Sequence, residues 1–187
     1  MHMSTKEPEK IKIGALEVEV PEGITVEIKG NEIDIKGSLG SNRRIFNDAL
    51  LEVKKSDRKL LITPVRDRGL EKKSRTSQIS MKKEIENDIR GVSQYYERKM
   101  RMVFAHFPIN VEVKGSVLQI NNIIGERFPR RANIVGSTKI EAKGQNVRVY
   151  GTSLDDVSQT AANIRQACRI RNKDSRVFQD GLYHEIE

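Results

Sequence analysis

The chain repeats one short pattern after 85 positions, and this repeat limits the folds that the chain can adopt. Segment 26–30, Val-Glu-Ile-Lys-Gly, returns at 111–115 as Val-Glu-Val-Lys-Gly. The same shift aligns three further pairs: Ile33 with Leu118, Ile35 with Ile120, and Gly40 with Gly125. Solenoid repeats are shorter, about 20 to 50 residues, so this spacing predicts two copies of one small domain.

The length of 187 residues allows two modest hydrophobic cores, one for each copy. A half of roughly 85 residues buries enough apolar surface to form its own compact unit. We therefore expect a flexible N-terminal tail over 1–9, a first domain over 10–91, a second domain over 92–174 and an extended C-terminal tail over 175–187.

Within each copy, apolar residues alternate with charged ones, and this period of two predicts half-buried strands. The first hairpin holds Val26 and Ile28 on one strand and Ile33 and Ile35 on the next, joined by Lys-Gly-Asn. We expect the Lys-Gly pairs to form turns and not a phosphate-binding loop, because glycine supplies the positive φ. Similar alternation predicts hairpins over 51–62, 111–120 and 140–149, a strand pair over 11–20, and a strand over 96–104.

Each copy ends in a segment with helical spacing. Over about 70–90, Met81, Ile85 and Ile89 lie four apart, and Gly91 is expected to stop the helix. The second helix is expected over about 154–171, with two acids in its first turn and arginines in its last. Its buried stripe is Val157, Ala161, Ile164 and Cys168. The fold class is therefore α+β, a tandem duplication in which antiparallel strands pack around one helix.

No pattern in the sequence assembles an active site. The histidines at 2, 106 and 184 lie far apart, and no His-Glu-x-x-His, Cys-x-x-Cys or Gly-x-Ser-x-Gly motif occurs. Segment 37–41 is glycine-rich but lacks the Lys-Ser/Thr pair of a phosphate-binding loop. Cys168 lies on an apolar stripe and is better explained as a core residue than as a nucleophile. We expect no enzyme activity, no cofactor and no metal; a metal-dependent nuclease with scattered acids is the enzymatic alternative.

The lone cysteine excludes an internal disulfide and fits a reducing cytoplasm. Residues 1–10 are polar and charged, which argues against a secretory signal. No apolar run approaches the roughly 18 residues of a membrane span, so no membrane association is expected.

A net charge of +8 and a pI near 9.6 favour a polyanionic partner, although a lysine-rich solvated surface would give the same totals. The first basic cluster, in segment 125–132, places Arg127, Arg130 and Arg131 around Phe128 and Pro129. Guanidinium groups bind phosphate oxygens bidentately, and an exposed ring can stack on a sugar or base. RNA contact is the favoured interpretation; the alternative is a solvated loop with one buried phenylalanine.

The second basic cluster spans 165–176 and carries Arg165, Arg169, Arg171, Lys173 and Arg176 against one acid. Because Arg165 and Arg169 are four apart, we expect them to share a helical face that is distinct from the buried stripe. The tail that follows contains Phe178 and Tyr183, and it is expected to order on folded RNA. A merely solvated tail would not need these rings.

Three segments resemble the archaeal and eukaryotic branch of the sixth large-subunit ribosomal protein family. They are Gly-Glu-Arg-Phe-Pro-Arg-Arg-Ala-Asn-Ile-Val-Gly at 125–136, the closing run 166–183, and segment 95–108. The closing run is the most specific, whereas the N-terminal half matches mainly in plan. With the duplication, the resemblance covers nearly the whole chain.

The resemblance implies a structural component of the cytoplasmic ribosome that binds 23S-type rRNA through its second domain and tail. It implies a position near the sarcin-ricin region and the stalk base, beside other large-subunit proteins and the docking site of translational GTPases. The carried-over rRNA contacts are Arg127, Phe128, Arg130, Arg131, Arg165, Arg169, Arg171, Lys173, Arg176, Phe178 and Tyr183. The family often keeps basic residues near its end, whereas this chain ends His-Glu-Ile-Glu. A free-standing RNA-binding translational regulator is the alternative.

Overall fold

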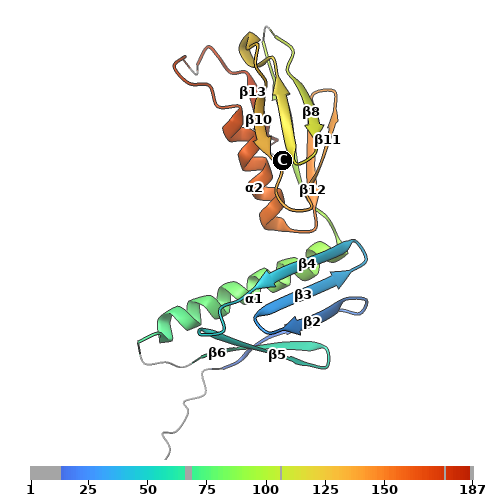
Figure 1. Ribbon diagram of the computed structural model, residues 1–187, viewed down its shortest axis with the longest axis vertical. Helices are drawn as coiled ribbons and strands as arrows, with labels where there is room; N and C mark the ends of the chain where they lie inside the picture. Colours follow the sequence, from blue (N-terminus) through green and yellow to red (C-terminus); the bar gives the residue numbers. More distant parts are fainter. Residues whose placement is uncertain (1–13, 66–68, 106, 175, 186–187) are drawn as a thin grey trace, which may run out of the picture. The chain divides into compact units, whose positions relative to one another are not determined.

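The computed structural model describes residues 14–65, 69–105, 107–174 and 176–185. The chain forms two compact units. One holds the chain up to Asp34 together with Arg43–Glu86, and the other holds Ile35–Asn42 and the chain from Asn87 onward. Each copy of the repeat is described below by itself (Figure 1).

The first copy consists of six strands followed by one long helix. The elements are β1 (Leu16–Glu19), β2 (Thr25–Lys29), β3 (Glu32–Gly37), β4 (Gly40–Ile45), β5 (Leu51–Ser56), β6 (Lys59–Pro64) and α1 (Glu71–Ser93). They form two three-stranded sheets, with orders β2-β3-β4 and β1-β6-β5. The predicted strand pair over 11–20 is only partly tested: the described part holds the single strand β1, which pairs with β6, and 11–13 lie outside the described residues.

The second copy repeats this plan and adds one strand. Its elements are β7 (Tyr96–Val103), β8 (Asn110–Lys114), β9 (Val117–Asn121), the short 3-10 helix η1 (Ile123–Gly125), β10 (Arg130–Asn133), β11 (Lys139–Lys143), β12 (Asn146–Gly151), α2 (Leu154–Ala167) and β13 (Gly181–His184). The sheet orders are β10-β9-β8 and β11-β12-β7-β13. Without β13 the two copies match strand for strand, which confirms the α+β tandem duplication.

The repeated turns have the chemistry that the sequence predicts. Gly30, Gly115 and Gly144 follow a lysine at the hairpin tips, and all three have φ near +60°. A residue with a β-carbon is strained there, so these Lys-Gly pairs are turns.

Both helix ends differ from the sequence expectation. Helix α1 continues through Gly91, which is buried and lacks the left-handed φ of a terminating glycine. Helix α2 ends earlier than expected, at Ala167, with Cys168 as its C-cap. Arg169 and Arg171 therefore follow the helix and do not lie in its last turn, which holds Arg165.

The end of the chain also differs from the expected extended tail over 175–187. Residues 181–184 form β13, which pairs antiparallel with β7 and brings Leu182 opposite Met102. Leu182 is 1% exposed and lies in the core with Met100, Leu118, Ile120 and Ile164. One buried leucine in a short segment gives too little alternation to be recognised as a strand.

Candidate nucleic-acid interface

The two predicted basic segments meet in the second copy. The Arg130 Nη1 atom donates hydrogen bonds to the carbonyl oxygens of Ala167, at 3.0 Å, and Arg169, at 2.9 Å. These carbonyls belong to the end of α2 and the residues after it, where helical partners run out. One guanidinium group thus joins segment 125–132 to the start of segment 165–176.

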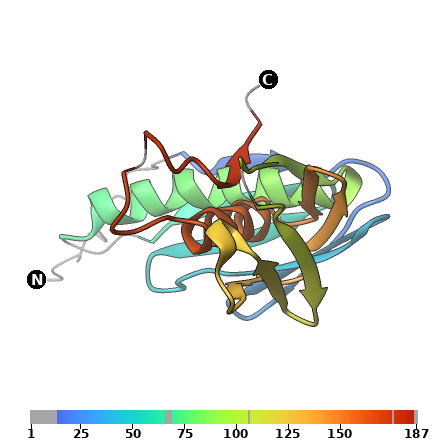
Figure 2. The ribbon, with the colours of Figure 1, turned by 90° about the horizontal axis from the view of Figure 1, so that it is seen from above.

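Strand β10 lies alongside α2, and this packing brings the segments together (Figure 1 and Figure 2). The Thr160 hydroxyl accepts a hydrogen bond from the Val135 backbone N–H at 3.0 Å, and the Asn163 amide donates to the Asn133 carbonyl at 2.9 Å. Ser153 caps the start of α2, and its hydroxyl accepts a hydrogen bond from the Asp156 N–H. These contacts hold β10 against α2, and this packing brings the arginines of the two segments close to each other.

Arg130 is a positioning residue in this arrangement. Its Nε donates to the Glu126 carboxylate at 2.7 Å, and its side chain is only 21% exposed. The hydrogen bond between them lowers the pKa of Glu126 and raises that of Arg130. All of these contacts are internal, so the structure gives Arg130 a different role from the direct rRNA contact expected from the sequence.

A groove of about 750 Å³ runs between the end of α2 and β13. Five of the residues predicted from the sequence line it: Arg165, Arg169, Lys173, Phe178 and Tyr183. Arg165 and Arg169 thus share the groove, although only Arg165 is helical. Cys168 and Leu182 also line it; both are almost fully buried in the core. Burial raises the pKa of the Cys168 thiol to about 11, which confirms a core residue and leaves no thiolate near neutral pH.

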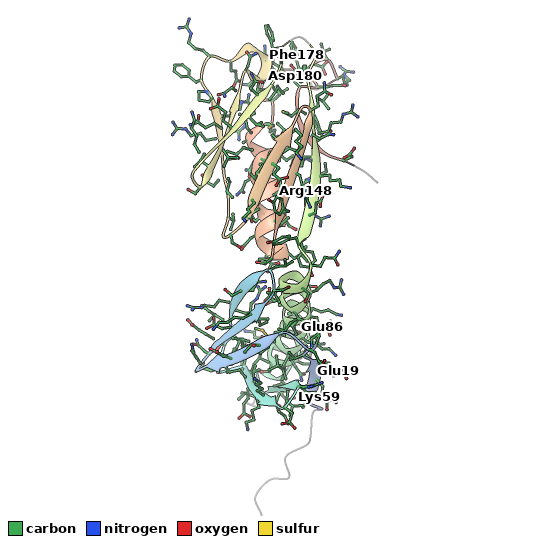
Figure 3. All side chains as sticks on the ribbon, turned by 90° about the vertical axis from the view of Figure 1, so that its right-hand side faces the viewer. Glu19, Lys59, Glu86, Arg148, Phe178 and Asp180 are labelled. Carbon is green, nitrogen blue, oxygen red and sulfur yellow. The ribbon has the colours of Figure 1, made fainter. Side chains whose placement is uncertain are left out.

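Asp180 anchors the segment that closes the groove. Its buried carboxylate accepts a hydrogen bond from the Ala105 backbone N–H at 3.0 Å, just after β7. Figure 3 shows Phe178 and Asp180 near one another at one end of the second copy. The Lys173 ammonium lies 4.9 Å from the centre of the Phe178 ring. Sequence reasoning missed Asp180, because its partner is a backbone group that no side-chain pattern reveals.

The other predicted contacts lie outside the groove lining. Arg127 and Arg131 are exposed, and Phe128 is 81% exposed, so the alternative of a buried phenylalanine in this loop is wrong. Arg131 lies on β10, opposite Gln119. Arg171 is exposed as well. Arg176 pairs with Asp174 at 3.0 Å but keeps 88% of its side chain exposed.

Metal and membrane sites are not indicated in the part of the chain that the structure describes. There, no three His, Cys, Asp or Glu side chains gather in a way that could hold a metal ion. Of the helices in the described ranges, none is long and apolar enough to cross a membrane.

Guanidinium groups and aromatic rings gathered along one groove are typical of proteins that bind nucleic acids, and here a duplicated α+β scaffold carries them. The family model for ribosomal protein L6 matches residues 107–181. "Large ribosomal subunit protein uL6" of Methanocella arvoryzae is 42% identical over 168 residues, covering 89% of this chain and 93% of that protein. The proteins of the same name from Methanobrevibacter smithii and Sulfurisphaera tokodaii are 40% and 38% identical; each alignment covers 89% of this chain, with 92% and 89% of the respective relative.

The chain therefore belongs to the ribosomal protein L6 family, as its resemblance to the archaeal branch predicts. Proteins of this family are structural and not enzymes.

Proposed function

We propose that this protein is a structural constituent of the large ribosomal subunit that binds 23S-type rRNA through its second copy. The observation that carries this proposal is the joining of the two basic segments by Arg130, which turns separate runs of sequence into one surface. The names of its relatives place those proteins in the large ribosomal subunit.

The proposal includes a location. The protein would lie in the cytoplasmic ribosome near the sarcin-ricin region and the stalk base, beside neighbouring large-subunit proteins and close to bound translational GTPases. The rRNA-binding domain is proposed to be 92–174 together with β13, and the first domain to be 10–91. The resemblance of the closing run 166–183 supports this assignment.

The groove residues and the exposed loop residues would make separate contacts with the RNA. Arg165, Arg169 and Lys173 would neutralise phosphates along the groove, since released counterions drive such binding. Phe178 and Tyr183, which are 36% and 41% exposed, offer ring faces for a ribose or an unstacked base. A second contact would come from the exposed set on the other segment: Arg127, Phe128 and Arg131. Arg171 and Arg176 would contact phosphates outside the groove.

The binding test compares single lysine and arginine removals. Each of Arg165→Ala, Arg169→Ala and Arg131→Ala should weaken binding to an rRNA fragment carrying the sarcin-ricin stem-loop. Each should also reduce the slope of log K against log salt by about one, because one phosphate contact is lost. Lys114→Ala is the matched control, since Lys114 is a turn residue paired with Glu112. Arginine variants that behave like this control would reject the assignment.

Sedimentation separates a ribosomal constituent from a free-standing regulator. A structural constituent should travel with large subunits through sucrose gradients at both low and high salt. A free-standing RNA-binding regulator should dissociate as salt rises.

A further inference from the structure

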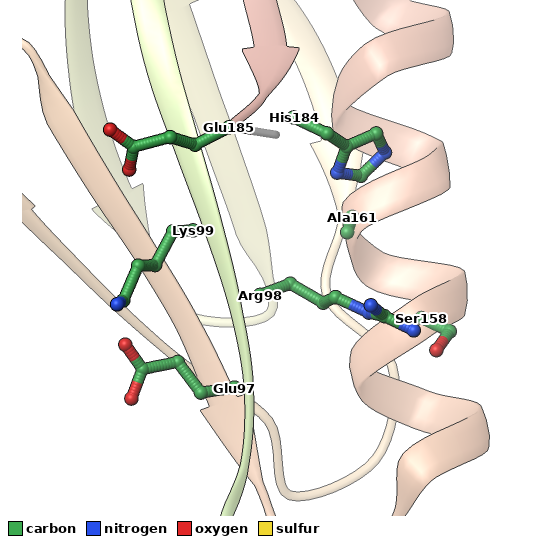
Figure 4. Close-up of a pocket in the computed structure, with 7 residues that line it drawn as sticks. All are labelled: Glu97, Arg98, Lys99, Ser158, Ala161, His184 and Glu185. Carbon is green, nitrogen blue, oxygen red and sulfur yellow. The ribbon is translucent and has the colours of Figure 1, made fainter. Parts of the chain in front are cut away.

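A second pocket, of about 730 Å³, adjoins the groove. It is lined by Glu97, Arg98, Lys99, Ser158, Ala161, His184 and Glu185, from β7, α2 and the end of β13 (Figure 4). His184 lines both this pocket and the groove, so the two lie next to each other. None of Arg98, Ser158 and His184 belongs to the rRNA contacts proposed above.

The strands place the charged side chains of this pocket on two sides, one facing α2 and one facing away from it. His184 lies opposite Met100 in the register of β13 and β7, and Met100 is buried in the core. Side chains alternate along a strand, so Arg98 shares the core-facing side with Met100. Figure 4 shows Arg98 and His184 pointing toward α2 and Ser158, whereas Glu97, Lys99 and Glu185 point to the opposite side of the strands.

The cations on the α2 side are not neutralised. Within the described ranges, neither Arg98 nor Arg165 forms an ion pair. Glu97 instead binds Arg148 at 2.7 Å on the other face of the sheet. Arg98 and Arg165 both act electrostatically on His184. Glu97 and Glu185 also line the pocket, but they point away from α2, so the donors on the α2 side face no carboxylate of this lining and favour an anion.

We infer that Arg98, Ser158 and His184 form a phosphate-binding subsite that extends the α2–β13 groove by one phosphodiester of the bound RNA. The inference rests on the proposed function, because the RNA strand in the groove supplies the phosphate. Arg98 can bind both non-bridging oxygens of a phosphodiester, and the Ser158 hydroxyl and the His184 ring N–H can each donate a further hydrogen bond to one of them. Arg165 links this subsite to Arg169 along the groove.

Phosphate at this subsite would couple binding to pH. Burial, with smaller effects of Arg165 and Arg98, lowers the pKa of His184 below its usual value of 6.5, so the free protein holds a neutral ring at pH 7. The groups that face it are Arg98 on β7 and Arg165 and Ser158 on α2, while Glu97 and Glu185 point to the other side. A phosphate would raise the pKa of His184, so binding takes up protons and RNA affinity should rise as pH falls toward about 6.

The test uses the full chain, the same rRNA fragment and three variants. Arg98→Gln should weaken binding about tenfold and reduce the salt slope by about one, as expected for one lost phosphate contact. His184→Asn should flatten the rise in affinity between about pH 7.5 and pH 6. The matched control is Lys139→Gln, because Lys139 lies on β11 at the far edge of the same sheet and should keep both properties.

A second readout does not depend on RNA. The NMR titration of the His184 ring should show a higher pKa in inorganic phosphate than in chloride at equal ionic strength, and Arg98→Gln should remove this difference. If Arg98→Gln binds RNA as Lys139→Gln does while Arg165→Ala weakens binding, the subsite is overturned and the proposed function stands. If inorganic phosphate raises the pKa of His184 but the bound RNA does not, the subsite is likewise overturned and the proposed function stands. If Arg165→Ala and Arg98→Gln both bind like wild type, both proposals are overturned.

Discussion

The two copies of the repeat share a strand plan but treat charge differently. Both copies contain ion pairs; in the first, they include Lys59 with Glu17 at 2.8 Å, Arg58 with Glu22 at 2.6 Å, and Arg43 with Asp34 at 2.9 Å. In the second, Arg165, Arg169 and Arg171 have no such acid partner within the described ranges. The copies therefore share a scaffold, and the proposed function rests on this group of arginines in the second copy.

The second difference is the strand that the end of the chain adds. Strand β13 extends the sheet at its β7 edge, whereas in the first copy the sheet order ends at β1, the counterpart of β7. The added strand supplies one wall of the groove and places Tyr183 and His184 there. Pairing of the 181–184 strand with the β7 edge thus forms one side of the groove in the second copy.

Loss of the added strand should have the largest effect on the second copy. Leu182→Ala removes a side chain that is 1% exposed, so the free energy of unfolding should fall by about 2 to 5 kcal/mol, as for other buried leucines. Val177→Ala is the control, because Val177 is 69% exposed in the segment before β13 and should cost little. Urea unfolding measures both; equal stability of the two variants would mean that β13 is not part of the core.

Substitutions of Arg130 and of its neighbour Arg131 should have different effects, the first on stability and the second on rRNA binding. Arg130→Ala removes hydrogen bonds to Ala167, Arg169 and Glu126, so it should destabilise the protein by about 1 to 3 kcal/mol. Arg131→Ala should leave the unfolding midpoint unchanged while weakening rRNA binding. Chemical unfolding and filter binding on both variants check this; a stable Arg130→Ala protein would remove the proposed link between the basic segments.

Charge removal from the first copy should leave rRNA binding nearly unchanged. Lys59→Ala breaks an exposed pair with Glu17, and such pairs contribute little to stability or to phosphate binding. Its affinity and salt slope should match the wild type, in contrast to Arg169→Ala. If Lys59→Ala loses as much slope as Arg169→Ala, the two copies do not differ in function as argued.

The smallest expected effect concerns acid stability. The Arg130 hydrogen bond lowers the pKa of Glu126, so this carboxylate stabilises the fold above its unfolded pKa and the contribution is lost as pH falls through the lower folded pKa. Glu126 is 42% exposed, so solvent reduces the effect. Glu126→Gln should therefore unfold slightly earlier at pH 7 but show a shallower loss of stability below about pH 4.5; parallel curves for both proteins would contradict this.

The sequence predicts the fold well because the alternation of apolar and charged residues is a local pattern, and because the same pattern recurs in both copies. The Lys-Gly turns, the buried stripes of both helices and the core position of Cys168 all follow from spacing. What the sequence does not predict depends on tertiary contacts. The end of α2 at Ala167, the strand around Leu182 and the anchor at Asp180 each require a partner far along the chain.

The candidate site was predicted as a set of residues but not as a geometry. Five of the eleven predicted contacts line the groove, and Arg130 instead holds the end of α2. No pattern of basic residues distinguishes Arg130 from Arg131, because only the packing of β10 beside α2 turns one inward and leaves the other exposed. Arg98 was absent from the prediction, since a charged residue on an alternating strand gives no sign of the helix across from it.

Site-specific crosslinking to large-subunit rRNA would show whether the two basic segments form one phosphate-binding surface. Photoreactive groups would be placed at Phe128 and Lys173, one in each segment, and at Lys29 in a turn of the first copy. We expect positions 128 and 173 to crosslink to neighbouring nucleotides of one rRNA element, and position 29 to give no comparable product. Crosslinks from 128 and 173 to rRNA elements remote from each other, or none from either position, would contradict this expectation.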